Sequence, residues 1–138
     1  MKKIIVHSDG GARGNPGPAA IGVVVTNEAN ESLLELSEAI GDATNNIAEY
    51  TAVLRGLQEI KLMFAAKTRE LEVDWRLDSE LVKKQLSGEY KIKNPGLRTI
   101  FLDIQDLRAH FPRLVFTHVR REYNQEADRL VNEALDRG

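Results

Sequence analysis

The sequence has 138 residues, of which 42% are hydrophobic and 29% are charged, and its formal net charge is -2. This length and composition predict one globular domain spanning residues 1–138. Because the chain contains no cysteine, disulfides, thiolate nucleophiles and cysteine-built zinc sites are excluded. The slightly acidic balance argues against binding nucleic acid through a broad basic field, so a polyanionic partner is expected to be held locally or through metal ions.

The first residues of the sequence predict neither a targeting signal nor a membrane-spanning segment. After Met1-Lys2-Lys3, the apolar run Ile4–Val6 is followed at once by polar residues. That run is too short for a signal-peptide core or a membrane span. We therefore expect a cytoplasmic protein without membrane contact, monomeric and without an obligate protein partner.

The first forty residues have the alternation and turn residues of β structure. Strands are predicted over Lys3–Ser8, Ile21–Thr26 and Ser32–Ala39, with Glu28–Glu31 as a polar turn. These three strands predict an antiparallel meander. The glycine-rich stretch 10–17 follows the first strand directly and is expected to form a wide loop, with Asp9 at the end of the strand.

After Gly41 the pattern changes to strands alternating with helices. In chain order, the spacing of apolar residues and the capping residues predict a helix from Asn46 to about Ala66, a strand over Leu71–Leu77, a helix capped by Asp78-Ser79 and ending at Leu86, a helix from Asn94-Pro95 to Phe111, a strand over Leu114–Val119, and a helix from Asn124 to about Asp136.

This order, βββαβααβα, predicts an α/β fold. Strands that alternate with helices are joined by right-handed crossovers, which gives a mixed sheet with helices on its faces. In such sheets ligands bind beyond the strand ends, where connections diverge to opposite sides. Catalytic or ligand-binding residues are therefore expected at those ends.

Four acids lie at such positions: Asp9, Glu49, Asp78 and Asp128. Each also has a local explanation, respectively a turn, a capping box starting at Asn46, a helix N-cap and a favourable interaction with a helix dipole. If the fold brings them to one edge of the sheet, they repel one another unless cations neutralise them. Oxygen-only ligands suit Mg²⁺ or Mn²⁺, and a pair of such ions suits phosphodiester hydrolysis.

Four segments around these acids resemble the signature segments of type I ribonuclease H, in the same order along the chain: SDGGARGNPG (8–17), TNNIAEY (44–50), LDSELV (77–82) and EADRL (126–130). The resemblance implies a five-stranded sheet of three antiparallel and two parallel strands. It implies an endonuclease that cuts the RNA strand of an RNA/DNA hybrid and leaves 5′-phosphate and 3′-hydroxyl ends. It also implies that Asp9, Glu49, Asp78 and Asp128 are the catalytic residues and hold two Mg²⁺ or Mn²⁺ ions.

The resemblance also implies substrate-binding residues. Such an enzyme must read the 2′-hydroxyl, which is both donor and acceptor. Residues expected to face the substrate are Gly11, Ala12, Arg13, Asn15, Asn45, Asn46 and Glu80, with Thr44 and Asn94 holding a phosphate of the DNA strand. The alternative for Thr44, Asn45, Asn46 and Asn94 is helix capping, which is compatible with binding.

Two departures from the family pattern bear on function. Where some relatives carry a basic helix and loop, this chain has only Ser87–Lys93, which predicts modest, salt-sensitive affinity for a hybrid. The loop before the last acid lacks the histidine that relatives often place there. We expect Arg121 to take its part, and His118, which falls in a predicted strand, to be structural.

Two alternative functions stay open at this level. One is a nuclease of the same fold that also cuts double-stranded RNA. The other is a hybrid-binding module without catalysis. The four acids argue against the second alternative, because uncompensated carboxylates do not help a protein to bind phosphates.

Overall fold

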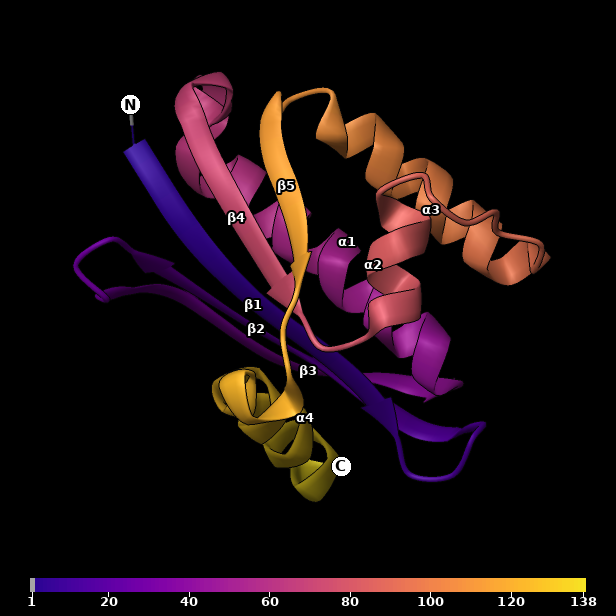
Figure 1. The fold of residues 1–138 in the computed structure, drawn as a ribbon. Helices are drawn as coiled ribbons and strands as arrows, with labels where there is room; N and C mark the ends of the chain where they lie inside the picture. Colours follow the sequence, from indigo (N-terminus) through magenta and orange to yellow (C-terminus); the bar gives the residue numbers. More distant parts are fainter. Residues whose placement is uncertain (1) are drawn as a thin grey trace.

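The structure is a computed structural model that describes residues 2–138. Its five strands are β1 (Lys2–Ala12), β2 (Gly17–Asn27), β3 (Ser32–Ala43), β4 (Leu71–Leu77) and β5 (Arg113–His118). They form one sheet in the order β3-β2-β1-β4-β5 (Figure 1). β1 pairs antiparallel with β2, and β2 with β3, whereas β4 runs parallel to both β1 and β5. The predicted mixed sheet is confirmed.

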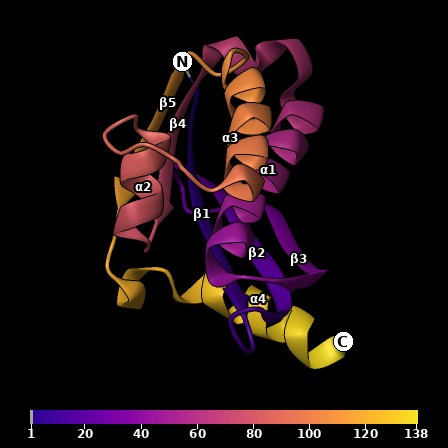
Figure 2. The same cartoon turned by 90° about the vertical axis from the view of Figure 1, so that its right-hand side faces the viewer.

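Helices cover both faces of this sheet (Figure 2). α1 (Asn45–Phe64), α2 (Glu80–Leu86) and α3 (Pro95–Arg108) lie on one side, and α4 (Gln125–Arg137) crosses the other side over β1, β2 and β3. Two glycines permit these close approaches. A Cβ on Gly10 would lie 2.2 Å from the Ala48 carbonyl carbon of α1, and one on Gly22 would lie 2.2 Å from the Ala127 carbonyl oxygen of α4.

The main core lies between the sheet and α1. The apolar stripe predicted for that helix is buried at Tyr50, Val53, Leu57 and Ile60, and it packs against a cluster that includes the fully buried Trp75 of β4. Each large apolar side chain buried in this way contributes roughly 1.5–3 kcal/mol. The core therefore holds α1 firmly against the strands from which the site is built.

The strands of the meander are longer than predicted. β1 continues through Asp9 to Ala12, because Asp9 pairs with Gly22 and the following residues pair with β2 up to Ala19. The expected wide loop is therefore reduced to residues 13–16, and Asp9 lies inside a strand rather than at its end. Small residues on both strands allow this pairing. The extension was not predicted because strands were recognised by their alternating apolar residues, and these small residues do not show that alternation.

Other element ends also differ from the prediction. α3 ends at Arg108 rather than Phe111, since the Phe111 N–H donates to the Arg108 carbonyl in a turn. Two short 3₁₀ helices, η1 (Ala65–Glu70) and η2 (Arg121–Tyr123), were not predicted. Such short segments leave no apolar periodicity in a sequence. None of the helices within residues 2–138 has the length and apolar character needed to cross a membrane.

Candidate active site

Three of the four predicted acids meet where β1, β4 and α1 come together. Asp9 lies on β1, Asp78 directly follows β4, and Glu49 lies in α1. Each offers a carboxylate oxygen, and these three oxygens all lie within 4.8 Å of one another. Asp9 is only 8% exposed and Glu49 only 7%. Carboxylates that are far apart in the sequence are therefore crowded into a poorly solvated space.

The backbone around Asp9 is held on both sides. The buried Ser8 hydroxyl accepts a hydrogen bond of 2.8 Å from the Trp75 indole N–H, which ties β1 to the neighbouring strand. On the other side, the Gly10 N–H donates to Glu49 Oε1 over 3.1 Å. Because Gly10 has no side chain, α1 can approach closely enough for Glu49 to make this bond. The sequence Ser-Asp-Gly thus positions two of the acids.

Neither Glu49 nor Asp78 has the helix-capping role that was the local alternative for it. The N-cap of α1 is Thr44, whose Oγ1 accepts from the Ile47 N–H, and Glu49 bonds to β1 instead of completing a capping box with Asn46. The N-cap of α2 is Ser79, whose hydroxyl accepts from the Val82 N–H over 3.2 Å. The Asp78 carboxylate is therefore not used as a cap and faces the cluster.

Asp128 lies in the first turn of α4 and borders the same cavity. It is outside the group of three whose oxygens lie within 4.8 Å of one another. Its charge nevertheless acts on Asp9, whose pKa it helps to raise. The structure thus brings all four predicted acids to one site, three of them tightly and Asp128 at the edge.

Burial and mutual repulsion make this cluster electrostatically unusual. Burial raises the pKa of Asp9 to about 7, against the lowering effect of its hydrogen bond with Glu49 and with further raising by the charges of Asp78 and Asp128. Burial also raises the pKa of Glu49 well above its ordinary value, and the neighbouring Asp9 raises it further. Such a site favours protons or cations over bare carboxylates.

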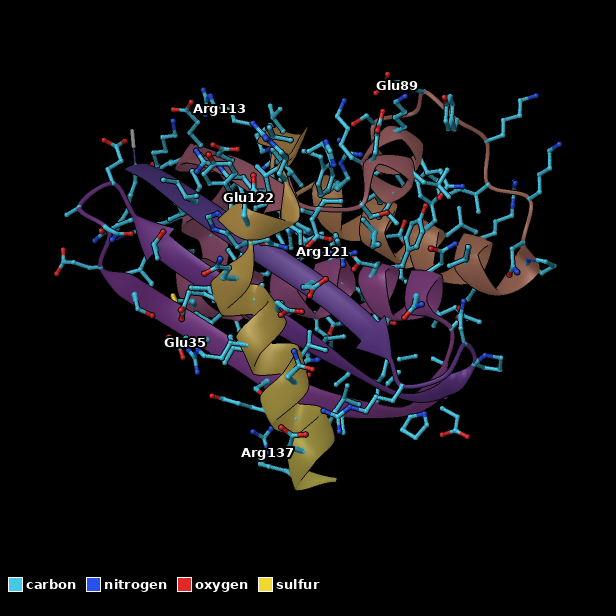
Figure 3. The ribbon with its side chains drawn as sticks, turned by 60° about the horizontal axis from the view of Figure 1, so that its bottom comes forward. Glu35, Glu89, Arg113, Arg121, Glu122 and Arg137 are labelled. Carbon is cyan, nitrogen blue, oxygen red and sulfur yellow. The ribbon has the colours of Figure 1, made fainter. Side chains whose placement is uncertain are left out.

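A cavity opens over these acids, and many of the residues expected to bind substrate line it. Besides Asp9, Glu49, Asp78 and Asp128, its lining includes the predicted residues Gly11, Ala12, Arg13, Asn45, Asn46 and Arg121. Arg121 comes from the η2 turn that leads into α4 (Figure 3). His118 lies at the end of β5, in the predicted strand, and is not part of this lining.

Four other predicted binding residues lie outside the cavity lining, and each makes a local contact. Thr44 caps α1, and the Asn94 side chain caps α3 by accepting from the N–H groups of Gly96 and Leu97. Glu80 pairs with Lys84 at 3.0 Å on the surface of α2. Asn15 accepts a hydrogen bond from the Asn45 N–H over 3.0 Å.

The loop side of the cavity is itself a hydrogen-bonded unit. The Ala12 N–H donates to Asn45 Oδ1 over 2.9 Å, and Asn15 links to the backbone of the same Asn45. The Ala12 amide is thus engaged within the protein. The side-chain oxygens of Asn15 and Asn45 are engaged as well, which leaves their Nδ2 groups as the donors those side chains can offer to a ligand.

The sequence interpretation did not identify several residues at the site. Ser79 and Asn132 line the cavity, and Asn132 Nδ2 donates to the Asp128 carbonyl over 3.1 Å. The helical spacing of four residues could have indicated that contact. Asn124, read only as the start of the last helix, donates to Asp78. No signal in the sequence pointed to that contact, because the two residues are distant along the chain.

Comparison with known proteins agrees with this fold. Residues 7–134 match the family model described as reverse transcriptase-like. The structure of LC11-RNase H1, isolated from compost by a metagenomic approach, is 51% identical with a TM-score of 0.93, covering 99% of this chain and 98% of that one. RNase H1 from the archaeon Halobacterium salinarum is 39% identical with a TM-score of 0.89, covering 99% of both chains. The chain therefore belongs to the type 1 ribonuclease H family.

Some curated relatives are much longer than this chain. The bifunctional protein Rv2228c of Mycobacterium tuberculosis is 42% identical over 135 residues, which are 97% of this chain but 36% of that protein. The chain thus spans about a third of that relative's length. LC11-RNase H1 has also been solved in complex with an RNA/DNA hybrid, and that structure is 50% identical to this chain with a TM-score of 0.92, covering 97% of both.

Proposed function

We propose that this chain is a divalent-metal-dependent endonuclease that hydrolyses the RNA strand of RNA/DNA hybrids and leaves 5′-phosphate and 3′-hydroxyl ends. The observation that carries the proposal is the convergence of Asp9, Glu49 and Asp78, whose oxygens lie within 4.8 Å of one another at the floor of an open cavity. Membership of the type 1 ribonuclease H family supports it, as does the hybrid complex of LC11-RNase H1.

The donor set fits hard divalent cations. All the candidate ligands are carboxylate oxygens, and the structure describes no histidine or cysteine in the group. Carboxylates are the ligands that Mg²⁺ and Mn²⁺ prefer. We propose that Asp9, Glu49, Asp78 and Asp128 hold two such ions. When bound, the two ions would activate a water and stabilise charge on the attacking and leaving oxygens.

The chain's own groups have separable roles in this scheme. Ser8 and Gly10 fix the backbone on either side of Asp9, and Gly10 orients Glu49 by donating to its Oε1. Arg121 lines the same cavity and offers a positive charge to a phosphate. We assign to it the part that a loop histidine plays in many relatives.

For substrate reading, the residues that line the cavity are the stronger candidates. Asn45, Asn46, Gly11 and Arg13 border the acids and would meet a minor groove that carries 2′-hydroxyls. We also propose Ala12, which lines the cavity, as a substrate contact, together with four residues outside the lining: Asn15, Thr44, Glu80 and Asn94. We also propose that residues 1–138 act as one domain, as a monomer in the cytoplasm.

The decisive experiment is a cleavage assay on a labelled RNA/DNA hybrid in Mg²⁺, Mn²⁺ or EDTA. Single-stranded RNA, double-stranded RNA and duplex DNA of the same sequence serve as controls. We expect cleavage of the hybrid's RNA strand with either metal and none in EDTA. Equal cleavage of double-stranded RNA would establish the broader nuclease, and metal-dependent binding without cleavage would overturn the enzymatic proposal.

A modified hybrid tests the reading of the 2′-hydroxyl. Single 2′-deoxy substitutions near the scissile phosphate should reduce cleavage at that step, because the cavity's amide donors lose their partner. The products are mapped at single-nucleotide resolution against an all-ribo control. An unchanged cut pattern would contradict the assignment of Asn45 and Asn46 as readers.

A further inference from the structure

Asn124 is a buried polar residue beside the acids that the proposed mechanism does not use. It lies between η2 and α4 and is 1% exposed. Its Nδ2 donates two hydrogen bonds, one of 2.9 Å to the Ser8 carbonyl and one of 3.1 Å to Asp78 Oδ2. One side chain therefore joins the backbone next to Asp9 to the carboxylate of Asp78.

The backbone of Asn124 makes two more contacts with the site. Its carbonyl accepts from the Asp128 N–H over 3.1 Å, and its own N–H donates to the Arg121 carbonyl over 2.9 Å. These bonds set where α4 starts and where η2 ends. Asn124 is thus bonded to the peptide preceding Asp9, to Asp78, to Asp128 and to Arg121.

A structural role as a helix cap does not account for this residue. Asn at a helix start normally stabilises the helix by accepting backbone N–H groups through Oδ1, but Asn124 makes no side-chain capping bond to α4. Within residues 2–138, its Oδ1 is buried without a hydrogen-bond partner. A buried, unsatisfied acceptor costs about 1–3 kcal/mol. What the side chain contributes therefore lies in its donor half.

The orientation of the amide follows from its partners. Both atoms that it contacts, the Ser8 carbonyl oxygen and Asp78 Oδ2, are acceptors, so only the NH₂ group can face them. This bond engages one oxygen of Asp78 and leaves the other available. Asp78 lies in the short connection between β4 and α2 rather than within a strand, so its carboxylate needs such a partner to be held in one orientation.

We propose that Asn124 is a positioning residue, which holds Asp78 in the orientation in which it and Asp9 bind a divalent cation together. This inference rests on the proposed function and deepens it. It names a residue that is needed for metal binding although it is not one of the acids. Hydrogen bonds from outer residues to metal-binding carboxylates typically affect metal affinity or activity by about 10- to 100-fold. The loss of Asn124 should therefore appear in metal binding before it appears in hybrid binding.

Two variants separate this role from simple destabilisation. Asn124→Ala removes both donated bonds, and Asn124→Ser keeps a good helix-start residue whose hydroxyl is too short to span the same contacts. Leu130→Ala is the control, because Leu130 is a buried residue of α4, the helix that begins directly after Asn124, packs near Gly22 and does not line the cavity. Its melting temperature should fall as much as that of the Asn124 variants, or more.

The measurements are the Mg²⁺-induced rise in melting temperature, followed by cleavage of a hybrid as a function of Mg²⁺ and of hybrid concentration well below the melting point of each variant. Both Asn124 variants should need about tenfold more Mg²⁺ for half of the stabilisation. Their kcat should fall by at least about tenfold, with KM for the hybrid changed less than about threefold. Leu130→Ala should keep the wild-type Mg²⁺ response and kcat.

The inference is overturned if both Asn124 variants keep the wild-type Mg²⁺ response, or if Leu130→Ala loses it to the same extent. A wild-type chain that is stabilised by Mg²⁺ but cleaves no hybrid would overturn the proposed function alone. In that case the melting measurements would still decide whether Asn124 positions Asp78.

Discussion

The acidic cluster (Asp9, Glu49 and Asp78) and three helix-capping side chains (Thr44, Ser79 and Asn94) have opposite effects on the stability of the fold. The first group contains two buried carboxylates whose pKa values are raised by burial, so its ionised form destabilises the fold. The second group satisfies helix N–H groups and stabilises the fold. Only the acidic cluster lacks a structural reason for its composition, which is why we assign the chemistry to it.

The largest expected effect comes from removing one charge of the acidic cluster. Asp9→Asn and Asp78→Asn should each reduce metal-dependent cleavage by at least about a thousandfold, the scale of losing a main electrostatic element of an active site. Circular dichroism should show an unchanged fold. Asp103→Asn, which removes an exposed carboxylate on α3 outside the cavity lining, is the matched control and should retain activity.

The second prediction concerns stability in EDTA as a function of pH. A raised pKa in the folded state means that the carboxyl contributes stability when protonated and loses it as pH rises through the folded value, which is about 7 for Asp9. This loss begins near the ordinary value of about 3.9 and is nearly complete above 7, so the stability gained by Asp9→Asn relative to wild type should be on the order of 2 kcal/mol larger at pH 8 than at pH 5.

Denaturant unfolding at both pH values checks this prediction. Adding Mg²⁺ at pH 8 should stabilise the wild type much more than Asp9→Asn, because a bound cation compensates the buried negative charge that the variant lacks. A stability difference that stays constant between pH 5 and pH 8 would mean that burial and the neighbouring carboxylates do not raise the pKa of Asp9.

The third prediction distinguishes the helix-capping role of Asn94 from its proposed role in substrate binding. Asn94→Ala should lower the free energy of unfolding by about 1 kcal/mol through the loss of the cap of α3. Asn94→Asp keeps a capping oxygen, so its stability should match wild type. It loses the amide donor and gains a negative charge, so KM for the hybrid should rise several-fold if Asn94 meets a phosphate. A wild-type KM for Asn94→Asp would restrict Asn94 to capping.

The smallest effect is expected at the cavity rim. Arg13 pairs with Asp136 at 2.6 Å, and both side chains are largely exposed. Exposed pairs of this kind contribute about 0–1 kcal/mol, so Asp136→Asn should leave stability nearly unchanged. Because it releases Arg13 toward the cavity, KM for the hybrid should fall slightly at low salt, and Arg13→Gln should raise it. If KM rises for Asp136→Asn and falls for Arg13→Gln, Arg13 is not part of the binding surface.

Much of the site was predictable because each acid lies at a recognisable position in the element order. The four acids were identified because the segments around them resemble one family. Asp9 and Asp78 lie close together because β1 and β4 are neighbours in the sheet. The local alternatives could not be decided in this way. Whether Glu49 completes a capping box or bonds to Gly10 depends on how closely α1 lies on β1. A Cβ on residue 10 would prevent this close approach.

The sequence by itself determined the order of elements, the apolar stripes of the helices and the set of acids, because these depend on periodicity and on residue types near each other in the chain. Only the tertiary structure decided that Asp9 lies inside an extended β1, that Ser79 rather than Asp78 caps α2, and that Asn124 bonds to Asp78. These features depend on strand register and on contacts across the sheet. Residues such as Ser8 and Asn124, separated by more than a hundred positions, carry no local signal that they will meet.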